Sequence, residues 1–262
     1  MVRDIVADRA DVSTERGIVE RPRRSAPGEF LADFFREEEM IRNFVIAAVF
    51  VGFNLAGIGI EPAFAQTPST HQHGFGGAEH WARVFDDPGR DAWQKPHQVI
   101  QALILAPNAV VADIGSGTGY FSIRLAHFVP KGRVFGVDIE PDMVKYLADR
   151  AKRDGLTNVT AVSGRPDDAR LPAKVDVAIM VDVFHHIADR DQYFRKLRES
   201  LKPGGRVAII DYKKDSPMGP PASERITADG VKAELRAAGY ALVKEHDFLP
   251  NQYFLIFRAA KS

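Results

Sequence analysis

Acidic and histidine side chains follow several short apolar runs, in positions where they could bind a ligand or move a proton. Asp113, Asp138 and Asp182 each end or follow such a run, and Asp211-Tyr212 ends another. In open α/β sheets, ligands bind beside the carboxyl ends of the parallel strands. We therefore expect these groups to lie close together at one edge of a sheet.

The segment Asp182-Val-Phe-His-His-Ile187 contains the groups best suited to acid–base chemistry. A histidine titrates near neutral pH and can take a proton from a hydroxyl or an amine. His185 and His186 are adjacent and must point in different directions, so only one is expected to face a substrate. We interpret His185 as the candidate general base, with Asp182 and Tyr212 as further candidate catalytic groups. The alternative is that both histidines pack against or cap the following helix.

A glycine-rich turn stands between a predicted strand and a predicted helix. Val110–Ile114 is short, apolar and β-branched, as in a central parallel strand. Gly115, Gly117 and Gly119 then allow a sharp turn and a close approach by a ligand. From Tyr120 the apolar spacing is helical, so the first amides of a helix point at whatever occupies the turn.

The spacing of this turn distinguishes between cofactors. A dinucleotide-binding turn reads Gly-x-Gly-x-x-Gly, whereas this chain has Gly-x-Gly-x-Gly preceded by Asp113. The Asp113 carboxylate would repel a pyrophosphate but can hold an ammonium group, directly or through water. Asp138, about twenty residues further along the chain, can accept both hydroxyls of a ribose. Ile139 beside it would cover one face of an adenine ring.

The segment Asp113-Ile-Gly-Ser-Gly-Thr-Gly119 resembles motif I of the class I methyltransferases that depend on S-adenosylmethionine (SAM). Leu201-Lys-Pro-Gly-Gly-Arg206 is also similar to this family, and the resemblance extends over about residues 78 to 260. It implies SAM as the cofactor and a small-molecule methyl acceptor. The implied cofactor-binding residues are Asp113, Gly115, Ser116, Gly117, Gly119, Tyr120, Asp138, Ile139, Asp167, Asp168 and Asp182.

Two further resemblances refine this expectation. Gly164–Pro172 resembles a Gly-Asp-Ala-x-x-Leu-Pro segment whose acid takes the adenine amino group, and an insertion leaves the choice between Asp167 and Asp168 open. Val181–Ile187 resembles small-molecule methyltransferases, including the arsenite and the ubiquinone/menaquinone branches. Arsenite methylation uses cysteine thiolates, and this chain has no cysteine, which excludes that chemistry but not its scaffold.

Composition limits the possible partners. The chain has 262 residues, a formal net charge of zero and no cysteine, so it has no disulfides or thiolate metal sites. Neutral charge argues against a nucleic acid as substrate. His71, His73 and His80 lack supporting carboxylates or thiolates, and we expect no metal there.

The N-terminal part of the chain has the anatomy of an export signal. Residues 1–39 are charged and are predicted to be a disordered or non-native extension. Residues 40–65 contain a basic start, an apolar run and small residues before a cleavage site, as in a secretory signal peptide. The expected location is the bacterial periplasm, with a linker at 66–77 and the methyltransferase domain at 78–262. The alternative is an inner-membrane anchor formed by residues 44–60.

The remaining pattern predicts an α/β fold, namely a Rossmann-like sheet of seven mostly parallel strands with a C-terminal antiparallel hairpin and helices on both faces. Five strand–helix steps precede the hairpin. Expected strands are 110–114, 133–138, 159–162, 176–181, 206–211, 240–246 and 253–258. Expected helices are 78–85, 95–105, a helix from 120, a helix from 141, 193–201 and 227–239. A turn at 202–205 precedes the fifth strand.

Three functions remain open at this level. The leading hypothesis is a SAM-dependent methyltransferase that acts on a small molecule. The others are a non-catalytic SAM- or nucleotide-binding protein and a nicotinamide-dependent oxidoreductase. Trp81, Phe85 and Trp93 are candidates to cap the cofactor cleft, or else they pack into the core. The polar, proline-rich loop Lys213–Ala222 is suitable as a substrate lid.

Overall fold

The computed structural model of the protein describes residues 77–260. The predicted extension, signal peptide and most of the linker, together with His71 and His73, lie outside the described residues. Between residues 77 and 260, no helix is long and apolar enough to cross a membrane. Helix α2 begins at Ala78, and the predicted domain boundaries stay a prediction.

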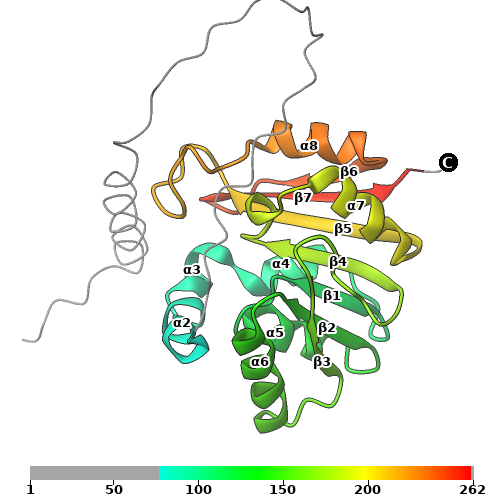
Figure 1. The fold of residues 1–262 in the computed structure, drawn as a ribbon. Coiled ribbons are helices and arrows are strands. Elements are labelled where there is room, and N and C mark those ends of the chain that lie inside the picture. The colour runs from blue at the N-terminus through cyan, green and yellow to red at the C-terminus, as the bar shows by residue number, and fades with distance from the viewer. Residues whose placement is uncertain (1–76, 261–262) are drawn as a thin grey trace, which may run out of the picture.

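Seven strands form one sheet in the order β3-β2-β1-β4-β5-β7-β6 (Figure 1). Their bounds are β1 Val110–Ile114, β2 Arg133–Asp138, β3 Val159–Ser163, β4 Val175–Val181, β5 Leu201–Tyr212, β6 Tyr240–His246 and β7 Gln252–Ala259. The first five strands are parallel to one another, and β7 pairs antiparallel with both β5 and β6. This sheet confirms the predicted fold class and the antiparallel hairpin.

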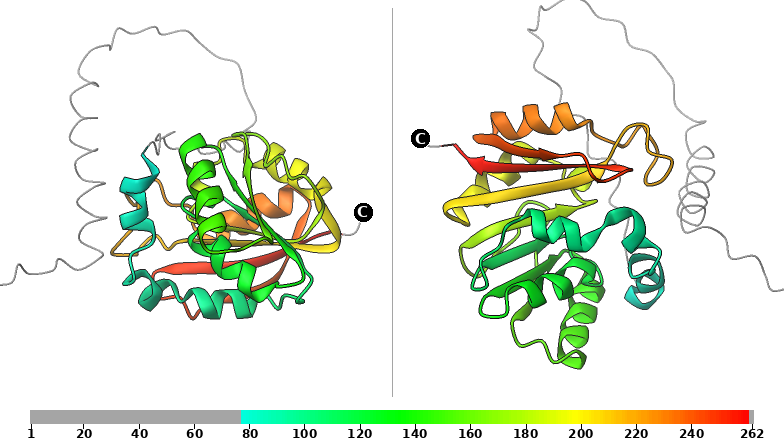
Figure 2. Two further views of the ribbon diagram at one scale, coloured as in Figure 1. Left: turned by 90° about the horizontal axis from the view of Figure 1, so that it is seen from below. Right: turned by 180° about the vertical axis from the view of Figure 1, so that it is seen from behind.

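Helices cover both faces of the sheet, as the two views of Figure 2 show. Their bounds are α2 Ala78–Phe85, α3 Arg90–Gln94, α4 Pro96–Ala102, α5 Tyr120–Phe128, α6 Pro141–Arg153, the short 3-10 helix η1 Phe184–His186, α7 Arg190–Glu199 and α8 Ala228–Ala237. Buried side chains of α4 and α5 share one core with the sheet, and those of α7 and α8 share the other. Successive strand residues alternate between these two cores, which makes the strands apolar on both sides.

Two predicted helices have different bounds in the structure. The helix expected at 95–105 is α4, which is shorter because it begins at Pro96 and ends at Ala102. A separate short helix, α3, ends just before it at Gln94, because Lys95 has φ +47° and Pro96 begins the next helix. A proline has no amide hydrogen and disfavours helical geometry in the residue before it. The helix expected at 193–201 is α7, which begins earlier because the Asp189 side chain accepts a hydrogen bond from Gln192 N.

The turn expected at residues 202–205 belongs to β5 in the structure. Pairing with β4 is irregular there, since Val175 opposes Leu201 but Val177 opposes Arg206. Gly204, with φ +77°, lies in the additional length of chain. The step from β3 to β4 also departs from the predicted count of five strand–helix steps, because a loop with an Arg165–Asp168 bridge replaces a helix.

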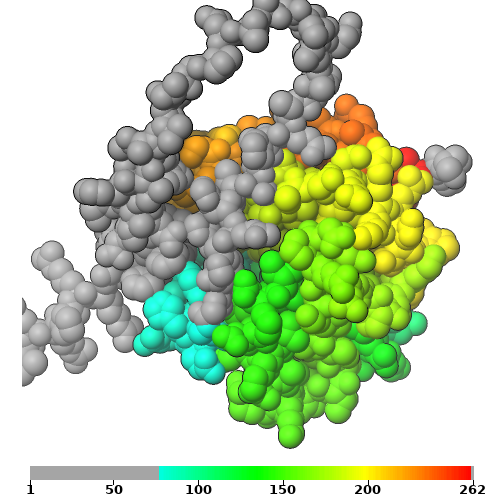
Figure 3. Space-filling view, in the orientation of Figure 1, coloured from blue at the N-terminus to red at the C-terminus, as the bar shows by residue number. Residues whose placement is uncertain are grey.

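The segment formed by α2 and α3 lies beside the carboxyl ends of the central strands. In the space-filling view, the cyan surface of α2 is continuous with the green surface of the α5 and α6 region (Figure 3). α2 contacts α6. The strand ends, the glycine turn and this N-terminal segment therefore come together on one side of the molecule.

Candidate functional site

The glycine turn between β1 and α5 is held by backbone hydrogen bonds to the end of β2. The amides of Gly115 and Ser116 donate to the Val137 carbonyl at 2.8 and 2.9 Å. Gly115 has φ +71° and is exposed, and a Cβ at this position would overlap the Val183 side chain. The turn therefore requires a residue without a side chain at Gly115, as the sequence pattern predicted.

Asp113 lies beneath this turn. Its side chain is buried, and Oδ2 accepts a hydrogen bond of 2.6 Å from Ser122 Oγ on α5. Burial raises the pKa of Asp113 to about 6, which exceeds the opposing effect of the Ser122 hydrogen bond. The carboxylate thus ties β1 to the first turns of α5. Its predicted contact with an ammonium group stays a prediction.

Asp138, which the sequence predicts to bind a ribose, lies next to the glycine turn. Its Oδ2 accepts from Gly117 N at 2.8 Å, and its Oδ1 accepts from Glu140 N at 3.0 Å. Burial raises the pKa of Asp138 despite these hydrogen bonds. Ile139 beside it is 48% exposed, so it presents an apolar surface next to this carboxylate. An acid and an adjacent exposed apolar surface suit a ribose that carries an adenine ring.

Two hydroxyls of the glycine turn are buried and lack a hydrogen-bond partner within the described part of the chain. They are Ser116 Oγ and Thr118 Oγ1. Buried polar atoms without partners are rare in folded proteins and carry a free-energy cost. Together with the exposed Gly115 and the free surface of Ile139, they fit a polar cofactor such as SAM.

Tyr120, the first residue of α5, is engaged by the N-terminal segment. Its hydroxyl donates to Asp91 of α3. The guanidinium groups of Arg90 and Arg124 lie 4.1 and 3.9 Å from its ring centroid. A cofactor contact of the Tyr120 side chain would therefore compete with these neighbours, and its predicted role in cofactor binding stays a prediction.

Asp182, at the end of β4, has a left-handed backbone with φ +59°. Its carboxylate accepts hydrogen bonds from the side-chain amides of Gln94 in α3 and Gln252 in β7. Arg90 approaches the same carboxylate at 3.9 Å. Burial and the negative charge of Asp211 raise the pKa of Asp182 to about 7. Asp182 thus links the N-terminal segment to the strand ends.

His185 and Asp211 form a buried pair directly beside Asp182. The Nδ1 atom of His185 lies 2.8 Å from Asp211 Oδ2 and 3.0 Å from Oδ1. Because a carboxylate accepts hydrogen bonds, Nδ1 carries the hydrogen, and Nε2 is the basic nitrogen of the neutral ring. Burial lowers the pKa of His185, but the Asp211 carboxylate outweighs that effect, so the net pKa is raised. His186 is partly exposed, and its ring is tilted by 43° against that of His185, with centroids 4.1 Å apart.

Tyr212 follows Asp211 and is also buried. Its ring centroid lies 6.2 Å from that of Trp93 in α3. Burial, and then the charge of Asp182, raises the pKa of Tyr212. The phenol therefore stays protonated and can act only as a hydrogen-bond donor or acceptor near neutral pH. All three predicted catalytic residues, His185, Asp182 and Tyr212, thus lie at one edge of the sheet.

Asp167 and Asp168 lie in the loop between β3 and β4. Lys196 of α7 contacts both carboxylates, at 3.0 and 3.6 Å. Hydrogen bonding to Lys196 lowers the pKa of Asp167. The backbone of this loop reaches the cofactor side through Gly164 N, which donates to Asp138 O at 2.9 Å. Which of the two acids receives the adenine amino group stays a prediction.

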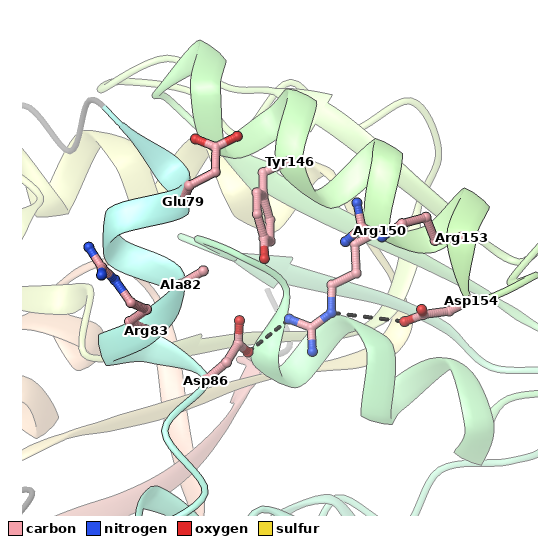
Figure 4. A pocket seen from close by; sticks show the side chains of 8 residues that line it. All are labelled: Glu79, Ala82, Arg83, Asp86, Tyr146, Arg150, Arg153 and Asp154. Atoms are coloured by element: carbon pink, nitrogen blue, oxygen red, sulfur yellow. Dashed lines mark hydrogen bonds and ion pairs between the residues drawn. The ribbon is translucent and has the colours of Figure 1, made fainter.

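A separate hollow of about 510 Å³ lies between α2 and α6 (Figure 4). Arg150 crosses it, donating to Asp86 Oδ1 at 2.8 Å and to the Thr118 carbonyl at 3.0 Å. The lining contains charges of both signs and none of the predicted site residues. We interpret Arg150 as a structural link between α2, α6 and the glycine turn.

His80 is an exposed residue of α2, and the expectation that it holds no metal stays a prediction. Its ring packs edge-on against Trp81, and Nδ1 lies 3.4 Å from Arg83 Nη2. Within residues 77–260, no group of three or more metal-binding side chains is present.

Three polar residues around Asp182 were missed by the sequence analysis. Gln94, Gln252 and Arg90 belong to no recognisable motif. Each lies in a segment remote in sequence from Asp182, so no local spacing could have identified it.

Comparison with known proteins identifies the family. The model of a methyltransferase domain matches residues 105–247, more than half of the chain. The chain therefore belongs to the class I SAM-dependent methyltransferases, and SAM is the cofactor of this family, as the sequence predicted.

Individual relatives agree with this assignment. The chain is 31% identical to an arsenite methyltransferase of Halobacterium salinarum over 53% of this chain and 39% of that protein. It is 28% identical to a ubiquinone/menaquinone biosynthesis C-methyltransferase of Shewanella sediminis over 41% and 44% of the two chains. A SAM-dependent methyltransferase structure from Aquifex aeolicus superposes with a TM-score of 0.65 and 25% identity, covering 70% of this chain and 99% of that one. The chain matches less than half the length of these two curated relatives.

Proposed function

We propose that this protein transfers a methyl group from SAM to a small-molecule acceptor, with His185 as the general base where the acceptor must lose a proton. The proposal rests on the buried His185–Asp211 pair at the strand ends. This pair lies at the same edge of the sheet as the glycine turn and Asp138. Asp211 orients the ring and leaves Nε2 to receive the proton. Family membership supports the cofactor half of the proposal.

SAM, when bound, supplies an activated methyl group on a sulfonium. Residues of this chain then need only align the acceptor and exclude water, because the transfer is an in-line displacement. Gly115–Gly119 and Asp138 are the proposed cofactor contacts. Gln94, held between Asp182 and Gln252 at 3.2 Å from each acceptor oxygen, closes the N-terminal segment over the strand ends.

Calorimetry with SAM and S-adenosylhomocysteine, paired with a methyl-release assay over a metabolite panel, tests this proposal. We expect binding of both ligands and turnover with at least one acceptor. Tight binding without turnover favours the non-catalytic binding protein instead. Binding of NADH, but not of SAM, favours the oxidoreductase.

Adjacent histidines provide a matched pair of variants. His185→Gln should lower the methyl-transfer rate about 100- to 10,000-fold, the usual contribution of a positioned base, and leave SAM affinity unchanged. His186→Gln is the control and should change the rate less than about threefold. Equal losses in the two variants, or none in either, would contradict the assignment of His185 as the base.

The pH profile tests the role of Asp211 separately. A base must be neutral to act, and Asp211 raises the pKa of His185 against the opposing effect of burial. The rate should therefore rise with pH through a pKa above the ordinary histidine value. In Asp211→Asn this rise should move to lower pH, and the maximal rate should fall. If the rate of Asp211→Asn rises over the same pH range as that of the wild type, the base is another group.

We also propose export of the protein, based on the predicted signal at residues 40–65. N-terminal sequencing of protein from its natural host should find Gln66 as the first residue. A retained Met1 would contradict export by cleavage.

A further inference from the structure

The loop after β5, residues 213–222, is fixed to the fold at several points. Lys213 N donates to Asn251 O at 3.0 Å, and Lys213 Nζ donates to Leu249 O at 2.9 Å. Asn251 Nδ2 contacts the sulfur of Met218 at 2.8 Å, and Met218 is buried. These contacts hold the loop against the fold in this conformation, and its predicted role as a substrate lid stays a prediction.

Arg225 is the centre of this fixation. Arg225 is only 8% exposed. Its guanidinium donates hydrogen bonds to four backbone carbonyls of the loop. The acceptors are Pro220 O at 2.7 Å, Ser216 O at 2.7 Å, Lys214 O at 3.0 Å and Lys213 O at 3.2 Å. Hydrogen bonds from a charged donor are stronger than those between neutral groups. A single side chain therefore closes the loop from its first residue to Pro220.

The fixed loop packs directly on Tyr212. Gly219 has φ +97°, and a Cβ at this position would lie 2.7 Å from three atoms of the Tyr212 ring. Tyr212 in turn faces Trp93. Glu224, next to Arg225 in the chain, contributes to the raised pKa of His185, so it lies within electrostatic range of the proposed base. The loop and its clamp thus adjoin both Tyr212 and His185.

We propose that Arg225 is a positioning residue that holds residues 213–222 as a preformed wall against Tyr212 on the acceptor side of the site. The proposal rests on the proposed methyl transfer and adds the element that shapes the acceptor pocket. Arg225 does so through backbone carbonyls, so its effect depends on the forked guanidinium and not on charge alone.

Arg225→Lys tests the clamp, because a lysine keeps the positive charge but cannot reach four carbonyls in the same geometry. The matched control is Arg236→Lys on the exposed side of α8. Trypsin cleaves after Lys213 and Lys214, inside the loop. We expect native Arg225→Lys to be cut there at least about tenfold faster than the wild type or the control. Unchanged resistance, or faster cleavage throughout the chain, overturns the clamp.

Effects on the site need separate measurements. The chain has two tryptophans, so Trp93 is the only one in a Trp81→Phe background. There, Arg225→Lys should increase acrylamide quenching of Trp93 about twofold and leave the affinity for S-adenosylhomocysteine within twofold. When Arg225→Lys is assayed with an acceptor from the metabolite panel, the KM for that acceptor should rise about tenfold, while the KM for SAM should stay constant. An unchanged acceptor KM overturns the positioning role.

Gly219→Ala provides a second variant if Arg225→Lys does not fold. It disturbs the same wall from the Tyr212 side and should give the same rise in loop cleavage and acceptor KM. A wild type that binds no SAM and methylates nothing overturns the proposed function, whereas the trypsin result still decides whether Arg225 clamps the loop. The two failures are therefore distinguishable.

Discussion

Replacing Asp138 by alanine is the most direct test of the cofactor site. The carboxylate holds Gly117 N at 2.8 Å and Glu140 N at 3.0 Å, so it organises the glycine turn and the start of α6 at once. We further expect it to accept both ribose hydroxyls of SAM. Asp138→Ala therefore removes two ligand hydrogen bonds and loosens the turn that faces the ligand.

The size of the loss follows from these contacts. A hydrogen bond to a charged group contributes about 1.5–3 kcal/mol, so two such bonds contribute about 3–6 kcal/mol. Since about 1.4 kcal/mol corresponds to a tenfold change in affinity, SAM binding should weaken about 100- to 10,000-fold. Calorimetry with SAM and S-adenosylhomocysteine measures this directly. Asp138→Asn keeps one acceptor oxygen without the charge and should give a smaller loss.

The control variant is Asp149→Ala on α6, whose exposed carboxylate pairs with Lys145 at 2.6 Å. We expect its SAM affinity to stay within about twofold of the wild type, because exposed ion pairs contribute little. Folded Asp138→Ala protein with wild-type affinity would refute the assignment of Asp138. The raised pKa of Asp138 gives a second check: SAM affinity should fall as acid protonates the carboxylate, beginning at a higher pH than for an ordinary aspartate.

Two further predictions concern stability. Burial raises the pKa of Asp113 to about 6 from 3.8, so the folded state retains a proton that the unfolded chain releases, and the free energy of unfolding falls as pH rises from about 4 to 6. Asp113→Asn cannot ionise and should escape this loss of stability, which is up to about 3 kcal/mol. Urea titrations at several pH values measure the difference. Parallel curves of stability against pH for the variant and the wild type would exclude the effect. Glu234→Gln should cost about 2 kcal/mol, because it leaves the buried Arg190 guanidinium without its carboxylate. Urea unfolding measures that loss, and an equal change in the exposed control Glu199→Gln would show that the ion pair is not responsible.

Much of the fold could be predicted because its information is local. Val110–Ile114 and Arg133–Asp138 are strands with the predicted bounds, since runs of buried β-branched residues that end in glycine or acid have few alternatives. The cap of α8 by Thr227 was also predictable, because its side chain accepts from Gly230 N three residues away. The predicted bounds were wrong where a single residue determined the start of a helix, as at Lys95 before Pro96, or where a strand included a predicted glycine turn.

The candidate site divides in the same way. Motif I, Asp138 and the adjacent histidines could be identified from spacing, because the strands that carry them end at one edge of a parallel sheet. The sequence analysis favoured His185, but the physical reason for that choice could not be predicted, since it depends on Asp211, which is 26 residues further along the chain. The network of Asp182, Gln94 and Gln252 joins three segments up to 158 residues apart.

The amino-acid sequence by itself determined the family, the cofactor and most of the succession of strands and helices along the chain, because these depend on short motifs and on the period of apolar residues. Only the tertiary structure decided which polar groups meet. It paired His185 with Asp211, enclosed Tyr120 between two arginines, and placed Arg225 among four carbonyls of a loop that the sequence predicted to be a lid. The physical reason is that a polar contact depends on distance and direction in space, and the packed fold sets these, not the spacing of residues along the chain.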